Sequence, residues 1–199
     1  MAILDTFKKF FQKEEVKEMK NILFVVGSLR EGSFNAQMAQ NAEKALERKA
    51  TVSYLNWKDV PVFSQDLEAE TPAAVQAARD AVLAADAVWF FSPVYNANIP
   101  GSLKNLIDWL SRALDLSDTS GVSAINEKVT TVTITSAAHH EKAADQYRAL
   151  LPFIRTNFVD ELTLASINGS AWADGKFVAE EATLAQLHKQ VEAVLAAIN

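Results

Sequence analysis

The chain is organised around one stretch, Asn21-Ile22-Leu23-Phe24-Val25-Val26-Gly27-Ser28-Leu29-Arg30-Glu31-Gly32-Ser33-Phe34-Asn35. A continuous apolar run ends at a turn rich in glycine, serine and arginine, and a helical pattern follows it. Such runs are typical of parallel strands, because helices cover both faces of their sheet. The turn after the strand directs backbone N–H groups and the positive end of the next helix at one place. We therefore expect an anion such as a phosphate to bind there.

The side chains of this turn favour a single terminal phosphate. The turn lacks the Gly-x-x-x-x-Gly-Lys-Ser/Thr of triphosphate sites and the Gly-x-Gly-x-x-Gly of dinucleotide sites. Ser28, Arg30, Ser33 and Asn35 supply hydroxyl, guanidinium and amide donors instead. Arg30 can bind one phosphate through two N–H groups, and Ser33 is placed to cap a helix whose first turn holds Phe34. The alternative is an ordinary strand-to-helix turn whose polar residues face water.

Strand patterns alternate with helical patterns along the rest of the chain. Five strands alternating with five helices predict a three-layer, doubly wound α/β fold with a parallel sheet. Five strands fit the order 2-1-3-4-5, in which the carboxyl ends of the first and third strands flank one crevice. The predicted strands lie within residues 22–26, 51–55, 86–91, 128–135 and 156–167, and the predicted helices within 35–49, 72–84 (capped by Thr71), 102–114, 139–150 and 179–198.

Residues 1–19 differ from the remainder. Ile3, Leu4, Phe7, Phe10 and Phe11 recur at helical spacing, so we expect an N-terminal amphipathic helical extension to one domain of residues 20–199. The extension is expected to dock on the domain or on a neighbouring subunit. The alternative is a helix that binds a membrane surface or a partner, which phenylalanines and lysines would suit but three nearby glutamates disfavour.

Composition excludes several classes of function. The 199 residues include 19 basic and 25 acidic side chains, and the resulting net charge of −6 argues against a nucleic-acid partner. The absence of cysteine excludes disulfides, zinc-thiolate sites, iron–sulfur clusters and thiol catalysis. No apolar run approaches the roughly 18 residues that span a bilayer, and the first 19 residues do not read as a signal peptide. We expect a cytoplasmic protein without membrane attachment.

Two further loops have compositions that suit a flat ligand. Residues 92–101 contain two prolines around Tyr95 and Asn96, and such a rigid ledge can pack along a heterocycle and hydrogen-bond its edge. Residues 135–140 are small until His139 and His140, so the backbone can approach a ligand closely. Adjacent histidines on a helix point about 100° apart and make a poor metal pair, so we expect both to be exposed and no metal to bind. We call residues 92–101 the second loop and residues 135–140 the third loop. For the second loop the alternative interpretation is that Tyr95 only packs over the core.

No paired carboxylates and no Ser/His/Asp arrangement appear, so a cofactor would carry any reaction. Two segments resemble motifs of a known family: residues 27–35, Gly-Ser-Leu-Arg-Glu-Gly-Ser-Phe-Asn, and the block from Pro93-Val94-Tyr95-Asn96 to Arg112. They are similar to the Gly-Ser-x-Arg-x-x-Ser-x-Asn loop and the Pro-Glu-Tyr-Asn…Pro-Gly-x-Leu-Lys-Asn-Ala-Ile-Asp-Trp-x-Ser-Arg block of the flavodoxin-like NADPH-dependent FMN reductases. The resemblance covers residues 20–199 in the order of elements and implies a flavodoxin-like fold that binds FMN.

The resemblance also implies an activity. Family members take a hydride from NADPH or NADH onto FMN and pass electrons to quinones, free flavin or similar acceptors. They are usually homodimers or homotetramers, with the counterpart of helix 104–112 near the interface. The implied cofactor-binding residues are Ser28, Arg30, Ser33, Phe34 and Asn35 around the phosphate, Pro93, Val94, Tyr95 and Asn96 along the ribityl chain and ring edge, and Ser136, Ala137, Ala138 and His139 beside the ring.

Two positions depart from the family pattern. Val94 stands where a glutamate is common, so hydrogen bonds or ion pairs of that carboxylate are absent. The turn Ser136-Ala137-Ala138-His139 replaces a Gly-Gly turn, and its methyl and imidazole groups could crowd the ring. Two other functions are therefore open: a non-enzymatic FMN electron carrier or sensor that works through a partner, and an interaction protein that has lost the cofactor.

Overall fold

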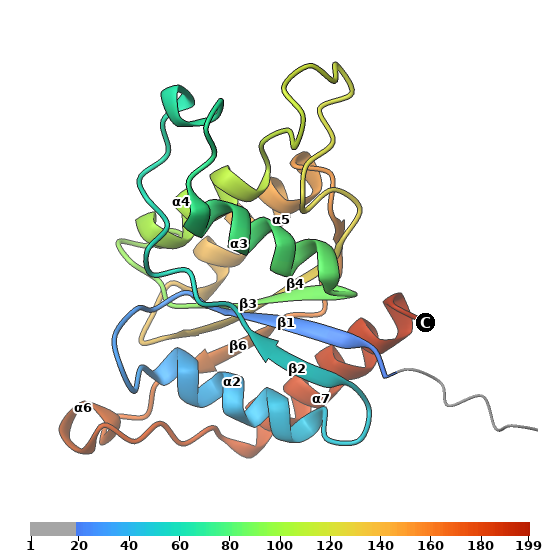
Figure 1. Ribbon diagram of the computed structural model, residues 1–199. Helices are drawn as coiled ribbons and strands as arrows, with labels where there is room; N and C mark the ends of the chain where they lie inside the picture. Colours follow the sequence, from blue (N-terminus) through green and yellow to red (C-terminus); the bar gives the residue numbers. More distant parts are fainter. Residues whose placement is uncertain (1–18) are drawn as a thin grey trace, which may run out of the picture.

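A parallel β-sheet forms the middle layer of the computed structural model, which describes residues 19–199 (Figure 1). Its order is β2-β1-β3-β4-β5, with β6 also paired to β4, and every pairing is parallel. The predicted order 2-1-3-4-5 is confirmed. The strands are β1 (Asn21–Val26), β2 (Thr51–Tyr54), β3 (Ala87–Ser92), β4 (Val129–Ser136), β5 (Asn157–Phe158) and β6 (Thr163–Ser166).

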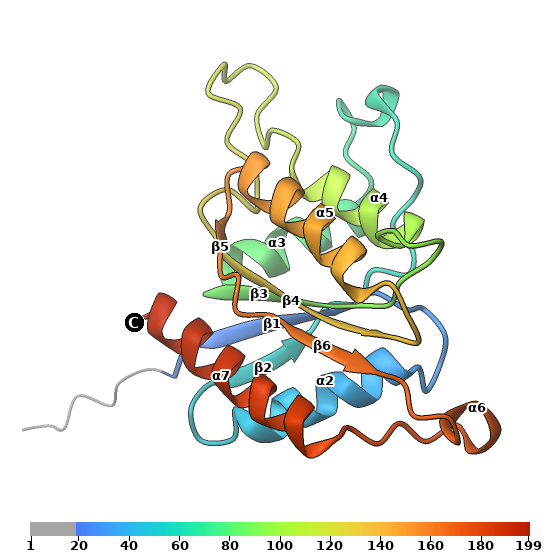
Figure 2. The same cartoon turned by 180° about the vertical axis from the view of Figure 1, so that it is seen from behind.

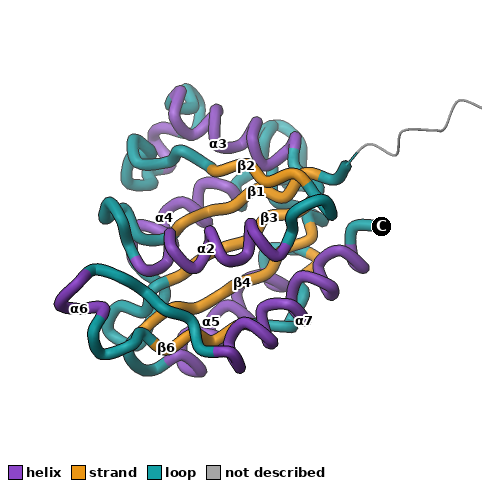
Figure 3. Tube along the Cα trace, turned by 90° about the horizontal axis from the view of Figure 1, so that it is seen from below, coloured by secondary structure: helices purple, strands orange, loops and turns teal. Residues whose placement is uncertain are grey.

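Helices cover both faces of this sheet. Figures 1 and 2 show α3, α4 and α5 on one face and α2 and α7 on the other. From below, α2 and α7 lie next to each other in front of the strands (Figure 3). The helices are α2 (Phe34–Ala45), α3 (Ala73–Ala84), α4 (Gly101–Leu110), α5 (His140–Phe153), the short α6 (Ala171–Asp174) and α7 (Glu181–Ala197), with one 3₁₀ turn, η1 (Gln65–Leu67).

Burial follows from this layering. Every residue of β3 and β4 is buried, as expected for central strands with helices on both sides. One apolar cluster lies between the sheet and α3, α4 and α5, and a second lies between the sheet and α2 and α7. Thr131 and Thr133 of β4 face the second layer, where Gln190 of α7 donates to Thr131 at 2.8 Å and accepts from Thr133 at 2.9 Å. These three buried side chains thus hydrogen-bond to one another, as buried polar groups normally do.

The fifth predicted strand is present as two pieces. β5 continues the sheet beside the start of β4, and β6 pairs with the end of the same strand. Between them, Asp160 is exposed and accepts a hydrogen bond from Arg148, and Glu161 accepts one from Gln186. Charged side chains at consecutive positions cannot both enter a covered sheet, so the strand is interrupted there.

Several predicted helix ends are wrong. α2 stops at Ala45 rather than Lys49, and Arg48 adopts a left-handed φ of 64°. α4 stops at Leu110 rather than residue 114, whereas α5 continues three residues past the predicted end and contains Pro152 in its last turn. Pro152 has no N–H to donate to the preceding turn, and the helix ends one residue after it.

The predicted Thr71 cap is also wrong. Pro72 occupies the cap position of α3 and makes no side-chain capping bond. The Thr71 hydroxyl is engaged elsewhere: it donates to the Glu68 carbonyl at 3.3 Å and accepts from Arg79 at 3.3 Å. The capping pattern is present in the sequence, but the hydroxyl bonds to the preceding turn and to Arg79 of α3 instead of the first N–H groups of the helix.

The predicted helical extension of residues 1–19 lies outside the described residues except for Met19. Within residues 19–199, no helix combines the length and the apolar character needed to cross a bilayer.

Candidate functional site

A cavity of about 320 Å³ lies where the carboxyl ends of β1, β3, β4 and β6 meet. The strand order brings these ends together, because the chain leaves β1 toward one edge of the sheet and β3 toward the other. All of the predicted site residues line it except Asn96, Ala138 and His139. The lining residues are Ser28, Arg30, Ser33, Phe34, Asn35, Pro93, Val94, Tyr95, Thr135, Ser136, Ala137, Ile167 and Trp172.

Two glycines shape the first loop. The N–H of Gly27 donates to the Phe91 carbonyl at 2.8 Å, and a Cβ at this position would lie 2.7 Å from the Leu103 side chain. Only glycine therefore lets β1 end this close to β3 and α4. Gly32 has a φ of +63°, a left-handed conformation that favours glycine.

Ser33 is the N-cap of α2, as predicted. Its hydroxyl accepts from the N–H of Ala36 at 3.2 Å, and its own N–H donates to the Arg30 carbonyl at 3.2 Å. The loop is thus folded over the start of the helix, and the positive end of α2 faces the cavity. This arrangement can hold an anion.

Arg30 supplies a cation at the mouth of the cavity. Its guanidinium carbon lies 5.0 Å from the centre of the Phe34 ring, and the guanidinium donates a long hydrogen bond of 3.4 Å to the Glu31 carbonyl. Within residues 19–199 no carboxylate forms an ion pair with Arg30. An exposed arginine that is not neutralised can bind a phosphate through two N–H groups.

Two buried polar atoms in the cavity lack hydrogen-bond partners. Asn35 is 4% exposed, and its amide donates to the Thr135 carbonyl at 3.4 Å while its Oδ1 is unpaired. The hydroxyl of Thr135, which is 1% exposed, is unpaired as well. A buried polar group without a partner costs about 1–3 kcal/mol, so such groups are normally paired. A polar ligand in the cavity would provide the missing partners.

The second loop forms a tight turn. Tyr95 and Asn98 exchange backbone hydrogen bonds of 3.2 and 3.0 Å, and the two residues between them, Asn96 and Ala97, have φ values of 53° and 59°. Positive φ at both central positions is typical of a type I′ turn. The turn places Pro93, Val94 and Tyr95 on the cavity and directs Asn96 away from it.

A buried hydroxyl pair holds this loop from below. Tyr147 of α5, which is fully buried, donates to Ser92 at 2.7 Å, and Ser92 donates to the Pro93 carbonyl at 2.7 Å. Burial raises the pKa of the Tyr147 phenol, so it remains a donor at neutral pH. The pair fixes where the loop leaves β3. Tyr147 was not among the predicted site residues, because it lies within the predicted helix 139–150, far in sequence from this loop.

The third loop turns its histidines in different directions. His139 has a φ of 61° and is exposed, as predicted. The prediction is wrong for His140, which is half-buried: its Nε2 lies 3.0 Å from the carbonyls of both Ser136 and Ala165 and so links β4 to β6. Since both partners are acceptors, Nε2 is the protonated nitrogen. Among residues 19–199, no group of three His, Cys, Asp or Glu side chains could hold a metal ion.

Three lining residues were missed. Thr135 is the penultimate residue of β4 and was not predicted to contact a ligand, and Ile167 and Trp172 follow β6. The indole of Trp172 packs edge-on against Phe34, with ring centres 5.2 Å apart and an angle of 86°. A signal for Trp172 existed, because it is an aromatic residue between the turn sequences Asn168-Gly169 and Asp174-Gly175.

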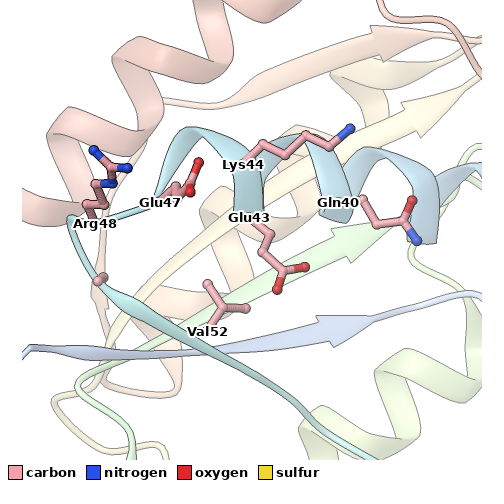
Figure 4. Close-up of a pocket in the computed structure, with 7 residues that line it drawn as sticks. Gln40, Glu43, Lys44, Glu47, Arg48 and Val52 are labelled. Carbon is pink, nitrogen blue, oxygen red and sulfur yellow. The ribbon is translucent and has the colours of Figure 1, made fainter.

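A second groove, of about 480 Å³, lies between α2 and β2 (Figure 4). Figure 4 shows the charged side chains of Glu43 and Lys44 on α2 and of Glu47 just after it. Glu43 accepts a hydrogen bond from Tyr54 at 2.7 Å, and partial burial together with this carboxylate raises the pKa of the Tyr54 phenol. No buried unpaired polar atom faces this groove among the described residues. The cavity at the strand ends is therefore the better candidate site.

Comparison with known proteins gives a consistent result. A family model described as NADPH-dependent FMN reductase matches residues 20–171. A quinone reductase from Escherichia coli K12 is 38% identical over 103 residues, which are 50% of this chain and 55% of that protein. A 2-hydroxy-1,4-benzoquinone reductase from a Burkholderia species is 35% identical over 91 residues, 46% of this chain and 50% of that protein. The chain thus spans about half the length of these curated relatives.

A solved structure extends the similarity over most of the chain. The flavoenzyme NAD(P)H:(acceptor) oxidoreductase FerB from Paracoccus denitrificans has a TM-score of 0.75 and 27% sequence identity. The match covers 90% of this chain and 97% of FerB. The overall fold and the family model therefore agree.

Proposed function

The chain belongs to the NADPH-dependent FMN reductase family, and from that premise we propose that it is an FMN-dependent NAD(P)H oxidoreductase that reduces quinones or similar acceptors. One observation carries the proposal: the phosphate-type loop and the uncompensated Arg30 face one cavity, and the residues that line it include Asn35 and Thr135, each with a buried unpaired polar atom. The names of the E. coli and Burkholderia relatives and of FerB support the choice of acceptor and donor.

The residues present fit FMN. Ser28, Arg30 and the start of α2 would hold its phosphate, because the helix end and the guanidinium both favour an anion there. Pro93, Val94 and Tyr95 would flank the ring as a ledge whose position is fixed from below. The chemistry that FMN supplies when bound is hydride acceptance from NAD(P)H and electron delivery to the acceptor.

The departures from the family pattern are compatible with this proposal. His139 is exposed and does not line the cavity, so its imidazole leaves the ring space free. Val94 is half-buried and supplies an apolar contact in place of a carboxylate. Ser136 donates to the Ala138 carbonyl at 3.0 Å, which keeps the third loop compact beside the cavity. Assembly as a homodimer or homotetramer and a cytoplasmic location belong to the same proposal.

The absorbance spectrum of the purified protein tests the proposal. A flavin spectrum that bleaches on anaerobic addition of NADPH or NADH, and returns on addition of a quinone, is the expected result. The nucleotide that bleaches faster identifies the preferred donor. A yellow protein that neither nucleotide bleaches would leave only an FMN carrier or sensor, and a colourless protein that does not bind added FMN would leave an interaction protein.

Substitution of Arg30 tests the phosphate assignment separately. We expect Arg30→Ala to weaken FMN binding by about 2 kcal/mol, roughly 30-fold in Kd, because a charged hydrogen-bond pair is lost. Fluorescence quenching of FMN measures the Kd. Lys44→Ala is the matched control, since this substitution also removes one cation, but in the last turn of α2 at the other groove. Equal Kd values for both variants would show that Arg30 does not contact the phosphate.

A further inference from the structure

The segment between β6 and α7 brings Trp172 to the cavity. α6 lies beside the start of α2 in Figures 1 and 3, although the two are far apart in sequence. Trp172 is 66% exposed, yet it lines the cavity and touches the Phe34 ring edge-on. The same ring carries the Arg30 guanidinium 5.0 Å from its centre. The family model ends at residue 171, so Trp172 lies beyond the matched region.

Gln37 of α2 fixes this segment in place. Its amide nitrogen donates to the Gly175 carbonyl at 2.8 Å and to the Gly32 carbonyl at 3.1 Å, and its oxygen accepts from the Phe177 N–H at 2.8 Å. One side chain therefore ties the Trp172 segment to the loop at the start of α2.

A second set of contacts closes the segment on itself. The Asn168 oxygen accepts from the Val178 N–H at 2.9 Å, and the Phe177 side chain is buried in the core beneath α2. These contacts hold both ends of the segment. The position of the exposed indole is thus set by the fold, and no large displacement is needed for it to meet a ligand in the cavity.

We propose that Trp172 is a further cofactor-binding residue, which closes the α2 end of the cavity and slows the release of FMN. The proposal rests on the proposed function. An indole offers a large, rigid apolar surface at small entropic cost, and much of that surface is uncovered here. FMN in the cavity would cover part of this indole surface, and it would have to break its contact with the indole before it could leave. Gln37 is the positioning residue that keeps the indole at the wall.

The release rate of FMN measures this effect directly. The holoprotein is mixed with an excess of apoflavodoxin, which binds every FMN molecule that is released. The transfer of FMN to apoflavodoxin is followed with time. We expect Trp172→Ala to release FMN about tenfold faster than the wild type, with a small change in association rate. Trp172→Phe keeps an aromatic edge against Phe34 and should retain most of the slow release.

Phe153→Ala is the matched control. Phe153 is also an exposed aromatic residue, 83% accessible, but it lies on α5 at a different groove. Its variant should release FMN at the wild-type rate. Gln37→Met keeps the side-chain volume and removes the three hydrogen bonds, so it should speed release and increase amide exchange across residues 168–178.

Two negative results have different meanings. If Trp172→Ala folds, binds FMN and releases it at the wild-type rate, the role of Trp172 is refuted while the proposed function stands. If the wild-type protein itself binds no FMN, the proposed function fails and this inference fails with it.

Discussion

Replacing Gly27 by alanine should both destabilise the protein and displace a loop that lines the cavity. The new Cβ would lie 2.7 Å from the Leu103 Cδ2, 3.1 Å from the Phe91 carbonyl oxygen and 3.2 Å from the Pro93 Cδ. Ordinary contacts between carbon atoms are about 3.5–4.0 Å, so Leu103, which is fully buried, has to move within a packed core. Overpacking of this kind costs about 1–3 kcal/mol.

The clash lies between the ends of β1 and β3, and Pro93 lines the cavity. Relief of the clash therefore displaces the second loop as well as Leu103. If the free energy of unfolding falls by about 2 kcal/mol, we expect the Tm of a chain of this size to fall by about 4–8 °C. We also expect FMN binding to weaken. Urea unfolding followed by circular dichroism gives the free energy of unfolding, and FMN fluorescence quenching gives the Kd.

Gly101→Ala is the control for Gly27→Ala. Gly101 begins α4, and a Cβ there meets no atom within 4 Å, so this variant should be neutral or slightly stabilising because alanine favours helix. If Gly27→Ala unfolds at the same urea concentration as the wild type and as Gly101→Ala, the account of the close approach at Gly27 is wrong.

Two further predictions concern the supports of the sheet. Partial burial raises the pKa of Asp86. The hydrogen bond from the Asn21 N–H and the Lys20 ammonium 3.1 Å away together lower it by more, so the pKa lies below its usual value. Asp86 therefore stabilises the fold above about pH 4, and the stability lost in Asp86→Asn, measured by urea unfolding, should be largest at pH 7 and shrink as the pH falls below about 4; a loss that is independent of pH would contradict this sign. Tyr147→Phe removes the donor to Ser92 and should lower the free energy of unfolding by about 1 kcal/mol, while an unchanged urea midpoint would show that this buried bond makes no net contribution.

Most of the architecture was predictable because it depends on local patterns. The apolar runs of residues 22–26 and 86–91 identify buried parallel strands, and their separation by helical patterns limits the sheet to few orders. The phosphate-type loop was also visible, since the Ser33 cap forms within a few residues of its partner Ala36. Among the errors, His140 is half-buried because its ring nitrogen contacts the Ala165 carbonyl, 25 residues away in sequence. Thr71 does not cap α3 because its hydroxyl bonds to Glu68 and Arg79 nearby in the chain.

The sheet order, the loop at the start of α2 and the resemblance to one family could all be predicted from local sequence, because periodicity, turn chemistry and short motifs act over a few residues. The contribution of Ile167 and Trp172 to the cavity wall, by contrast, followed only from the three-dimensional arrangement. Trp172 meets Phe34, and Gln37 meets Gly175, because β6 pairs with β4 and directs the following segment back across α2. Contacts of this kind depend on strand register and packing between distant segments, which no local pattern encodes.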